Sequence, residues 1–172
     1  MNVLSITGIK AAPAAKVVKG LNQLLADFQV YYTNLRGYHW HVRGPQFFTL
    51  HEQFEKMYDG AAEHIDEIAE RILQLGAMPE NRFSEYLKIS KIKEQTKVSS
   101  KDDIIPLILN ALKVLIAQER AVAALADEAG DIATGDLVSD LIDEQEKTVW
   151  MIASLEAQLQ QHKQGPDRWS AS

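Results

Sequence analysis

The sequence predicts an all-α fold, a bundle of four long helices with one long crossover between the second helix and the third. Two observations lead to this prediction. The 172 residues are rich in Ala, Leu, Glu, Gln and Lys and include only 5 Pro and 9 Gly. The glycines and prolines fall mostly between long stretches in which apolar residues recur every three or four positions. A chain of this length is expected to form one domain with its own core.

The first long helix is predicted to begin near Ala15 and to end at Gly44-Pro45. Residues 1–14 show no sustained period and are predicted to form an N-terminal tail. Proline ends the helix because it lacks the amide donor and restricts the residue before it. The apolar stripe of this helix runs directly into His39, which is therefore expected to point inward or into an interface; the stripe comprises Leu21, Leu24, Leu25, Phe28, Tyr32 and Leu35.

The second helix is predicted from about Gln46 to Leu75, where Gly76 and Pro79 close it. The next twenty residues form a connection. A short amphipathic helix is expected within this crossover, carrying Phe83, Tyr86, Leu87 and Ile89.

The third and fourth helices are predicted on either side of a glycine turn. Ser100 is expected to cap the third helix, which runs to about Ala129 and ends at Gly130. Thr134 is expected to cap the fourth helix, whose apolar face continues to about Gln161.

The predicted domain spans residues 15–162, followed by a short C-terminal tail over residues 163–172. Four long helices in this order, with a long link between the second and the third, match a ferritin-like four-helix bundle with one crossover. An up-down bundle with short loops fits this layout less well.

Composition excludes several kinds of function. The formal net charge of −6 opposes non-specific attraction to nucleic acid or to an anionic membrane and favours attraction of cations. The chain has no cysteine, so any bound metal must use nitrogen and oxygen ligands. No stretch approaches the ~20 apolar residues of a membrane span, and no secretory leader is recognised, so we expect a cytoplasmic protein without a membrane partner.

Metal-ligand residue types share one face of the second helix, opposite its apolar stripe. His51, Glu55, Asp66 and Glu70 lie within about 100° of one another around the helix axis. His51 and Asp66 are nevertheless about 22 Å apart along it, at a rise of roughly 1.5 Å per residue. They can share a metal only across two chains. A second copy, antiparallel about a two-fold axis near Asp59-Gly60, brings His51 of one chain beside Asp66 and Glu70 of the other, twice per dimer.

His39 lies one short loop away from the second helix and can join His51 from the same side. Two imidazoles with two or three carboxylates suit iron(II), although zinc, cobalt and manganese also fit this ligand set. A di-iron site within one bundle would need Glu-x-x-His pairs, and the residues three positions before the five histidines are Arg36, Tyr38, Phe48, Ala61 and Leu159.

Two further histidines and one indole need an interpretation. His41 and His64 fall outside this geometry and are interpreted as surface or packing residues. Trp40 is either an anchor for the end of the first helix or an electron donor beside a redox metal. A lone histidine on an apolar stripe, or acidic residues at four-residue spacing, most often has no binding role; the combination of these features favours the metal site.

Residues 38–72, with the text YHWHVRGPQFFTLHEQFEKMYDGAAEHIDEIAERI, resemble the Dps family, the small ferritin-like cages called DNA-binding proteins from starved cells. The helix layout extends the resemblance over most of the chain. The resemblance implies a ferroxidase site between two-fold-related subunits, made by His39, His51 and Glu55 of one chain with Asp66 and Glu70 of its partner. The family commonly has Asp in place of Glu55.

The resemblance also implies an assembly, a hollow homo-dodecamer built from two-fold dimers. This cage is expected to oxidise iron(II), preferably with hydrogen peroxide, and to store iron(III) mineral, which protects the cell against oxidative damage. Acidic three-fold pores admit iron in this family, and Asp136 with Asp131 are the candidates here. An alternative is that these carboxylates serve only an ordinary helix start.

DNA binding is predicted to be weak or absent, although the family name suggests it. The predicted tails offer Lys10 at one end and Lys163 with Arg168 at the other, the latter two offset by Asp167. Twelve chains at −6 carry 12 × −6 = −72, an unfavourable field for a polyanion. The alternatives that remain are a DNA-compacting nucleoid protein with secondary metal binding, and a helical assembly domain whose histidines merely pack.

Overall fold

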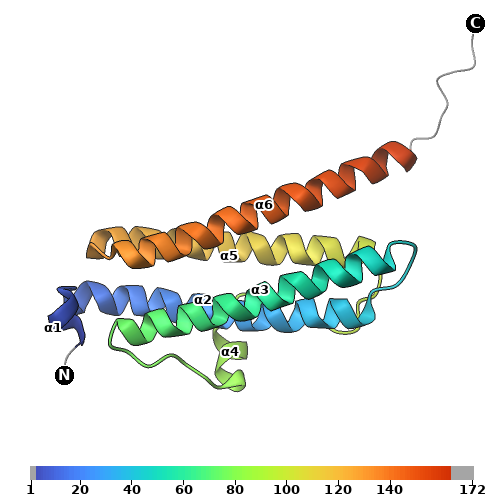
Figure 1. Cartoon of the computed structure of the whole chain (residues 1–172). Coiled ribbons are helices and arrows are strands. Elements are labelled where there is room, and N and C mark those ends of the chain that lie inside the picture. The colour runs from blue at the N-terminus through green and yellow to red at the C-terminus, as the bar shows by residue number, and fades with distance from the viewer. Residues whose placement is uncertain (1–2, 164–172) are drawn as a thin grey trace, which may run out of the picture.

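Four long helices lie side by side in the computed structural model, which describes residues 3–163 and side chains as far as Leu155 (Figure 1). They are α2 (Ala11–His41), α3 (Phe47–Gln74), α5 (Lys101–Ala129) and α6 (Ile132–Lys163). Two short helices, α1 (Val3–Thr7) and α4 (Phe83–Ile89), complete the described part of the chain, which contains no strand. The all-helical prediction is confirmed.

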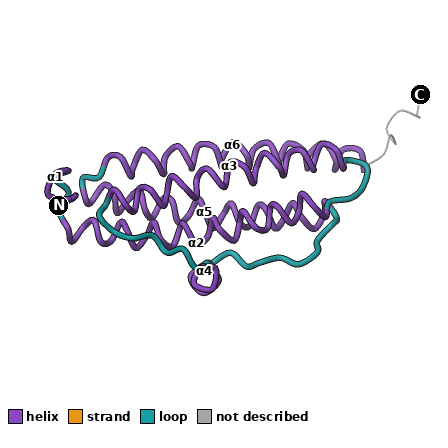
Figure 2. The backbone as a smooth tube through the Cα atoms, turned by 60° about the horizontal axis from the view of Figure 1, so that its bottom comes forward, coloured by secondary structure: helices purple, strands orange, loops and turns teal. Residues whose placement is uncertain are grey.

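The long crossover leads from α3 to α5 and carries α4 outside the bundle (Figure 2). Helix α2 packs against both α3 and α5, while α5 packs against α6 and α4 rests on α2. The predicted position of the crossover and of its short helix is therefore confirmed. Within the described residues, no helix combines the length and apolar composition needed to cross a bilayer.

The N-terminus is more regular than expected. Helix α2 begins at Ala11, four residues before the predicted start at Ala15, and residues 3–7 form α1 instead of an irregular tail. Pro13 is compatible with this early start because the first turn of a helix does not need its amide donor. The boundaries of the domain, 15–162, stay a prediction. Of the predicted C-terminal tail, residues 164–172 lie outside the described residues.

The hydrophobic core confirms the apolar stripes of α2 and α3. On α3 the buried side chains lie on the face away from the acidic residues; they are Leu50, Phe54, Ala61, Ile68 and Ile72. Helix α5 contributes its own stripe against α2 and α6, and its buried apolar members are Ile104, Ile105, Ile108, Ala111, Leu112, Leu115, Val122 and Ala126. The acidic face of α3 is thus directed away from the core of its own chain.

The junction between α5 and α6 corrects one prediction. Gly130 ends α5 in the left-handed conformation, with φ of 65°, as the sequence indicated. The cap of α6 is Asp131 and not Thr134: its Oδ1 accepts the Thr134 amide at 3.1 Å, and the Thr134 hydroxyl donates to Oδ2 at 2.6 Å. A carboxylate suits the cap position because its two oxygens can accept both hydrogen bonds at once.

Arg71 of α3 forms hydrogen bonds with the same junction. Its guanidinium donates to Asp131 Oδ1 at 2.6 Å and to Thr134 Oγ1 at 2.8 Å. Asp131 is buried, and both of its carboxylate oxygens accept hydrogen bonds from its own chain. This network ties the C-terminal end of α3 to the start of α6.

Replacing Gly130 by alanine is expected to destabilise the fold by about 1 kcal/mol, because an L side chain is strained at its positive φ. Apart from Gly130 and its two neighbours in the chain, no described atom lies within 4 Å of the added methyl group, so the effect is one of backbone conformation. Urea unfolding followed by circular dichroism measures it. Gly135→Ala is the control: it also meets open space but lies inside α6, where alanine should stabilise by about 0.5 to 1 kcal/mol. Equal effects of the two variants would contradict this explanation.

Candidate functional site

His39 and His51 meet where α2 ends and α3 begins. The turn through Gly44 reverses the chain, and the two imidazole rings stack with centroids 3.7 Å apart at 21°. Each ring bonds to the backbone of the other residue: His39 Nδ1 lies 2.8 Å from the His51 carbonyl oxygen, and His51 Nδ1 lies 2.8 Å from the His39 carbonyl oxygen. The structure therefore brings together the two histidines that the sequence paired.

These reciprocal bonds define the tautomer of both rings. A carbonyl oxygen only accepts, so each Nδ1 carries the proton and donates it. In the neutral imidazole the lone pair then lies on Nε2, the nitrogen that in either ring makes no hydrogen bond to the described residues. A histidine oriented by a backbone carbonyl through Nδ1 is the usual arrangement of a metal ligand. His39 and His51 together are called the histidine pair below.

Aromatic side chains surround the histidine pair. Phe47 stacks on His51 with centroids 5.0 Å apart, and Tyr58 presents its ring edge-to-face to His39 at 5.4 Å. The Tyr58 hydroxyl donates a long hydrogen bond, 3.4 Å, to Oε1 of Glu55. Partial desolvation and the charge of Glu55 raise the pKa of Tyr58, so its hydroxyl keeps its proton at neutral pH.

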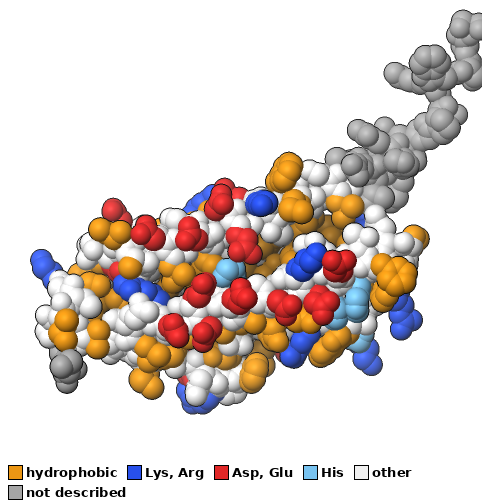
Figure 3. All heavy atoms as spheres, in the orientation of Figure 1, with side chains coloured by type: hydrophobic (Ala, Val, Ile, Leu, Met, Phe, Trp, Pro, Cys, Tyr) orange, Lys and Arg blue, Asp and Glu red, His pale blue; other side chains and the backbone are white. Residues whose placement is uncertain are grey.

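The three predicted carboxylate ligands lie on the exposed face of α3. Glu55, Asp66 and Glu70 are all solvent-exposed, and acidic side chains follow this helix across the surface in Figure 3. Among the described residues, neither Asp66 nor Glu70 has an ion pair or a hydrogen-bonded side-chain partner. Nowhere in that part of the chain do three histidine, aspartate or glutamate side chains gather into a metal site. Within the described residues of one chain, the structure does not bring Asp66 and Glu70 together with the histidine pair.

The remaining predicted residues have different surroundings. His64 lies between Glu67 of its own helix and Glu144 of α6, each at 3.1 Å, and so contributes to packing between helices. The Trp40 indole is 62 % exposed at the end of α2. Arg36 places its guanidinium 5.0 Å from the Trp40 ring centroid and 5.1 Å from that of Tyr32.

Asp131 and Asp136, the two residues considered for an iron-entry pore, differ in exposure. Asp136 is exposed on the first turns of α6. Asp131 is buried, paired with Arg71 and used as a helix cap. Its carboxylate serves the junction of its own chain, which argues against a place in a pore.

Glu119 and Gln145 form a buried polar pair in the bundle interior that was not predicted from the sequence. Glu119 of α5 is fully buried, and Gln145 of α6 donates a short hydrogen bond to its Oε1. Glu119 Oε2 and Gln145 Oε1 have no hydrogen-bond partner among the described residues, and burial raises the pKa of Glu119 to about 8. The signal was present in the sequence, because Glu119 interrupts the apolar stripe of α5 between Leu115 and Val122.

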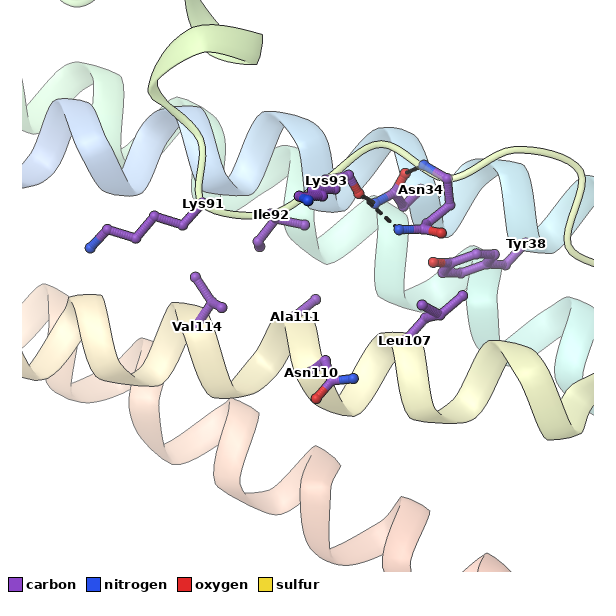
Figure 4. A pocket seen from close by; sticks show the side chains of 10 residues that line it. Asn34, Tyr38, Lys91, Ile92, Lys93, Leu107, Asn110, Ala111 and Val114 are labelled. Atoms are coloured by element: carbon purple, nitrogen blue, oxygen red, sulfur yellow. Dashed lines mark hydrogen bonds between the residues drawn. The ribbon is translucent and has the colours of Figure 1, made fainter.

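A cavity of about 120 Å³ lies between α2, α5 and the crossover (Figure 4). The Asn34 amide spans its upper edge, donating to the Lys93 carbonyl at 2.9 Å and accepting from the Gln95 amide at 2.8 Å. These bonds hold the crossover against α2. Apolar side chains of α5 line the opposite wall, namely Leu107, Ala111 and Val114.

Comparison with known proteins identifies the family. A family model described as the ferritin-like domain matches residues 18–162. The DNA protection during starvation protein of Porphyromonas gingivalis is 53 % identical over 152 residues, which cover 88 % of this chain and 96 % of that protein. The chain belongs to the Dps family of ferritin-like proteins.

Solved Dps structures have the same fold. The Dps protein of Vibrio cholerae O1, described as a member of a broad superfamily of ferritin-like diiron-carboxylate proteins, superposes with a TM-score of 0.84 at 43 % identity. The match covers 86 % of this chain and 92 % of that one. The Dps protein of Bacillus brevis gives a TM-score of 0.82 at 36 % identity, covering 86 % and 99 % of the two chains. The predicted resemblance is thus confirmed.

Proposed function

We propose that this Dps chain is a mini-ferritin that oxidises iron(II), with hydrogen peroxide as the preferred oxidant, and stores the iron(III) product as mineral inside a hollow dodecamer. Consuming iron(II) together with peroxide would protect a cell from hydroxyl radicals. We infer a cytoplasmic location for this cage. The observation that carries the proposal is the histidine pair, in which both Nδ1 atoms are occupied and both Nε2 lone pairs are left for a metal.

The proposed site forms twice in each two-fold dimer. His39, His51 and Glu55 of one chain face Asp66 and Glu70 of an antiparallel partner. The separation of these two groups along α3, with no complete ligand set among the described residues of one chain, supports sharing between chains. Two further observations are compatible with this pairing, since Asp66 and Glu70 are exposed and lack partners among the described residues.

The ligand types explain how such a site could favour oxidation. The imidazoles bind iron(II) as neutral ligands, and the carboxylates compensate its charge. Carboxylates interact more strongly with iron(III), because the attraction grows with the charge of the ion. Binding to these carboxylates therefore favours oxidation of iron(II) to iron(III). The diiron-carboxylate description of the related Vibrio protein supports iron as the substrate, and zinc is a competing occupant of the same nitrogen and oxygen ligands.

Two ancillary roles belong to this proposal. Asp136 is our candidate for an acidic entrance to the cage, because its carboxylate is exposed whereas that of Asp131 is not. Trp40 is a candidate electron donor close to the histidine pair.

DNA protection is the second candidate function, because the related proteins carry that name. The net charge of −6 per chain opposes contact with a polyanion, and so we place iron oxidation first.

The proposal predicts a particle of 12 × 19.3 kDa, about 230 kDa, that binds at least one iron(II) per chain. Native mass spectrometry measures the mass. Anaerobic titration with iron(II), followed by addition of peroxide and absorbance of the ferric product, measures binding and oxidation. A monomer in solution, or a cage that takes up no iron(II), would refute it.

A further inference from the structure

The cavity between α2, α5 and the crossover, called the crossover cavity below, contains a buried hydroxyl group without a partner. Tyr38 is only 4 % exposed, and its hydroxyl points into the space between the crossover and α5 (Figure 4). No described residue forms a hydrogen bond with this hydroxyl. Burial raises the pKa of Tyr38 to about 12, so the hydroxyl keeps its proton and can donate it. A buried donor without a partner is costly, and it indicates that the cavity has an occupant.

The rest of the crossover cavity is largely apolar. Leu107, Ala111 and Val114 follow one another at one-turn spacing on α5 and point toward the crossover, where Ile92 points toward them (Figure 4). The volume of about 120 Å³ approaches that of a cavity that holds benzene, roughly 150 Å³. Apolar walls with a few polar groups are typical of sites for small molecules. A fitting occupant has a compact apolar body and one polar group at the Tyr38 end.

Positive charge lines the crossover cavity and negative charge does not. Lys91 and Lys93 belong to its lining, which includes no aspartate or glutamate among the described residues. Lys91 donates to the Gln118 side chain at 2.9 Å, whereas Lys93 forms no ion pair with a described residue. In a chain with a net charge of −6, this local exception favours an anion as the occupant.

The apolar walls decide which kind of anion fits. An inorganic oxyanion carries oxygens on every side, and those directed at Leu107, Ala111 and Val114 would lose their hydration without gaining a partner. A monocarboxylate has both of its oxygens at one end. It can direct them at the hydroxyl and the lysine and leave its hydrocarbon part against α5.

We propose that the crossover cavity binds a small organic monocarboxylate with a compact apolar body. The carboxylate accepts a hydrogen bond from the Tyr38 hydroxyl and is attracted by the Lys93 ammonium group. The apolar body lies against the wall of α5. A ligand in this place contacts α2, α5 and the crossover together, and so it stabilises the attachment of the crossover to the bundle. The site includes none of the proposed iron ligands, and the inference therefore does not depend on the proposed function.

The test titrates the metal-free, full-length protein with benzoate and follows binding by saturation-transfer NMR of the ligand. We expect saturable binding, and weaker binding of benzamide, which has nearly the same shape but no charge. Tyr38→Phe should weaken benzoate binding about tenfold, a loss typical for a hydrogen bond to a charged group. Lys93→Gln should weaken it by up to about fivefold, since an exposed ion pair contributes less. Circular dichroism and native mass spectrometry check that each variant folds and assembles as the wild type does.

Three further variants show whether benzoate occupies the crossover cavity. Ala111→Leu fills the space and should abolish binding while both polar groups stay in place. Tyr31→Phe is the matched control for Tyr38→Phe, because Tyr31 lies on the same helix and is similarly buried but does not line the cavity. Lys97→Gln is the control for Lys93→Gln, because Lys97 is an exposed lysine of the crossover outside the lining. Both controls should bind benzoate as the wild type does.

Three outcomes would overturn the inference. Equal binding by the wild type, Tyr38→Phe and Ala111→Leu places the bound benzoate elsewhere on the protein. Benzamide that binds as tightly as benzoate shows that the site does not select an anion. Absence of saturable binding of both benzoate and the smaller butyrate shows that the cavity holds water only.

Discussion

Replacing His51 by alanine is expected to weaken iron(II) binding by at least about 100-fold and to abolish rapid oxidation by peroxide. The variant loses one proposed ligand nitrogen. It also loses the stacking on His39, so the second ligand is less well oriented. Loss of an orienting partner alone typically costs 10- to 100-fold in metal affinity, and loss of a ligand costs more. Anaerobic titration and stopped-flow absorbance measure the two effects.

His41→Ala is the matched control for this experiment, because His41 lies two residues from His39 but outside the histidine pair. It should leave binding and oxidation unchanged within about twofold. Equal losses in the two variants, or an unaffected His51→Ala, would refute the assignment of the site.

A separate experiment tests whether the metal site is shared between chains. Chains carrying His51→Ala are assembled together with chains carrying Asp66→Asn and Glu70→Gln. A mixed dimer contains one site with all its ligands and one site that lacks both groups. Mixed cages should therefore recover oxidation that neither variant shows alone, up to about half of the wild-type rate for each mixed dimer. No recovery in cages proven to be mixed would refute the inter-chain site.

Replacing Glu119 by glutamine is expected to stabilise the protein at alkaline pH by an amount on the order of 5 kcal/mol. Burial raises the pKa of Glu119 to about 8, from 4.5 in the unfolded chain. Each pH unit of such a difference corresponds to about 1.4 kcal/mol. The glutamine amide has nearly the same shape, carries no charge at any pH, and can still pair with the Gln145 amide.

The sign of the pH dependence follows from the two protonation states. Below about pH 4.5 the carboxyl group is protonated in both the folded and the unfolded chain. Between 4.5 and about 8 the unfolded chain loses its proton while the folded chain keeps it, so the contribution of Glu119 to stability falls as pH rises. Above about 8 both forms are ionised and the dependence levels off.

Urea unfolding of both proteins between pH 5 and pH 9 tests this expectation, with the difference between them as the measured quantity. The difference should be small at pH 5 and should grow toward pH 8. Glu146→Gln is the control, because Glu146 is exposed and pairs with Arg120 at the surface. A constant difference between wild type and Glu119→Gln across this range would contradict a protonated Glu119.

Local interactions made much of the architecture predictable. The apolar stripe through Leu21, Phe28 and Leu35 was enough to place α2 and to direct His39 inward. Gly130 was enough to end α5, because its left-handed conformation suits glycine. Signals of this kind act within a few residues and can be read from the chain.

The sequence predictions were wrong or incomplete where residues far apart in the chain determine the local structure. Thr134 is a good cap by type, but Asp131 takes the position because Arg71, from another helix, neutralises its buried carboxylate. Glu119 was not predicted to be buried. Its burial depends on how α5 meets α6, which periodicity does not specify.

By itself, the sequence determined the all-helical class, the crossover, and a separation of His51 from Asp66 too long for one metal, because helix periodicity and rise follow from local geometry. Only the tertiary structure decided that the histidine pair stacks and that each Nδ1 bonds the other residue's carbonyl. It likewise decided that Tyr58 bridges His39 and Glu55, and that Glu119 is buried against Gln145. Such contacts depend on the angle and register at which whole helices pack, and neither is contained in the pattern of any one helix.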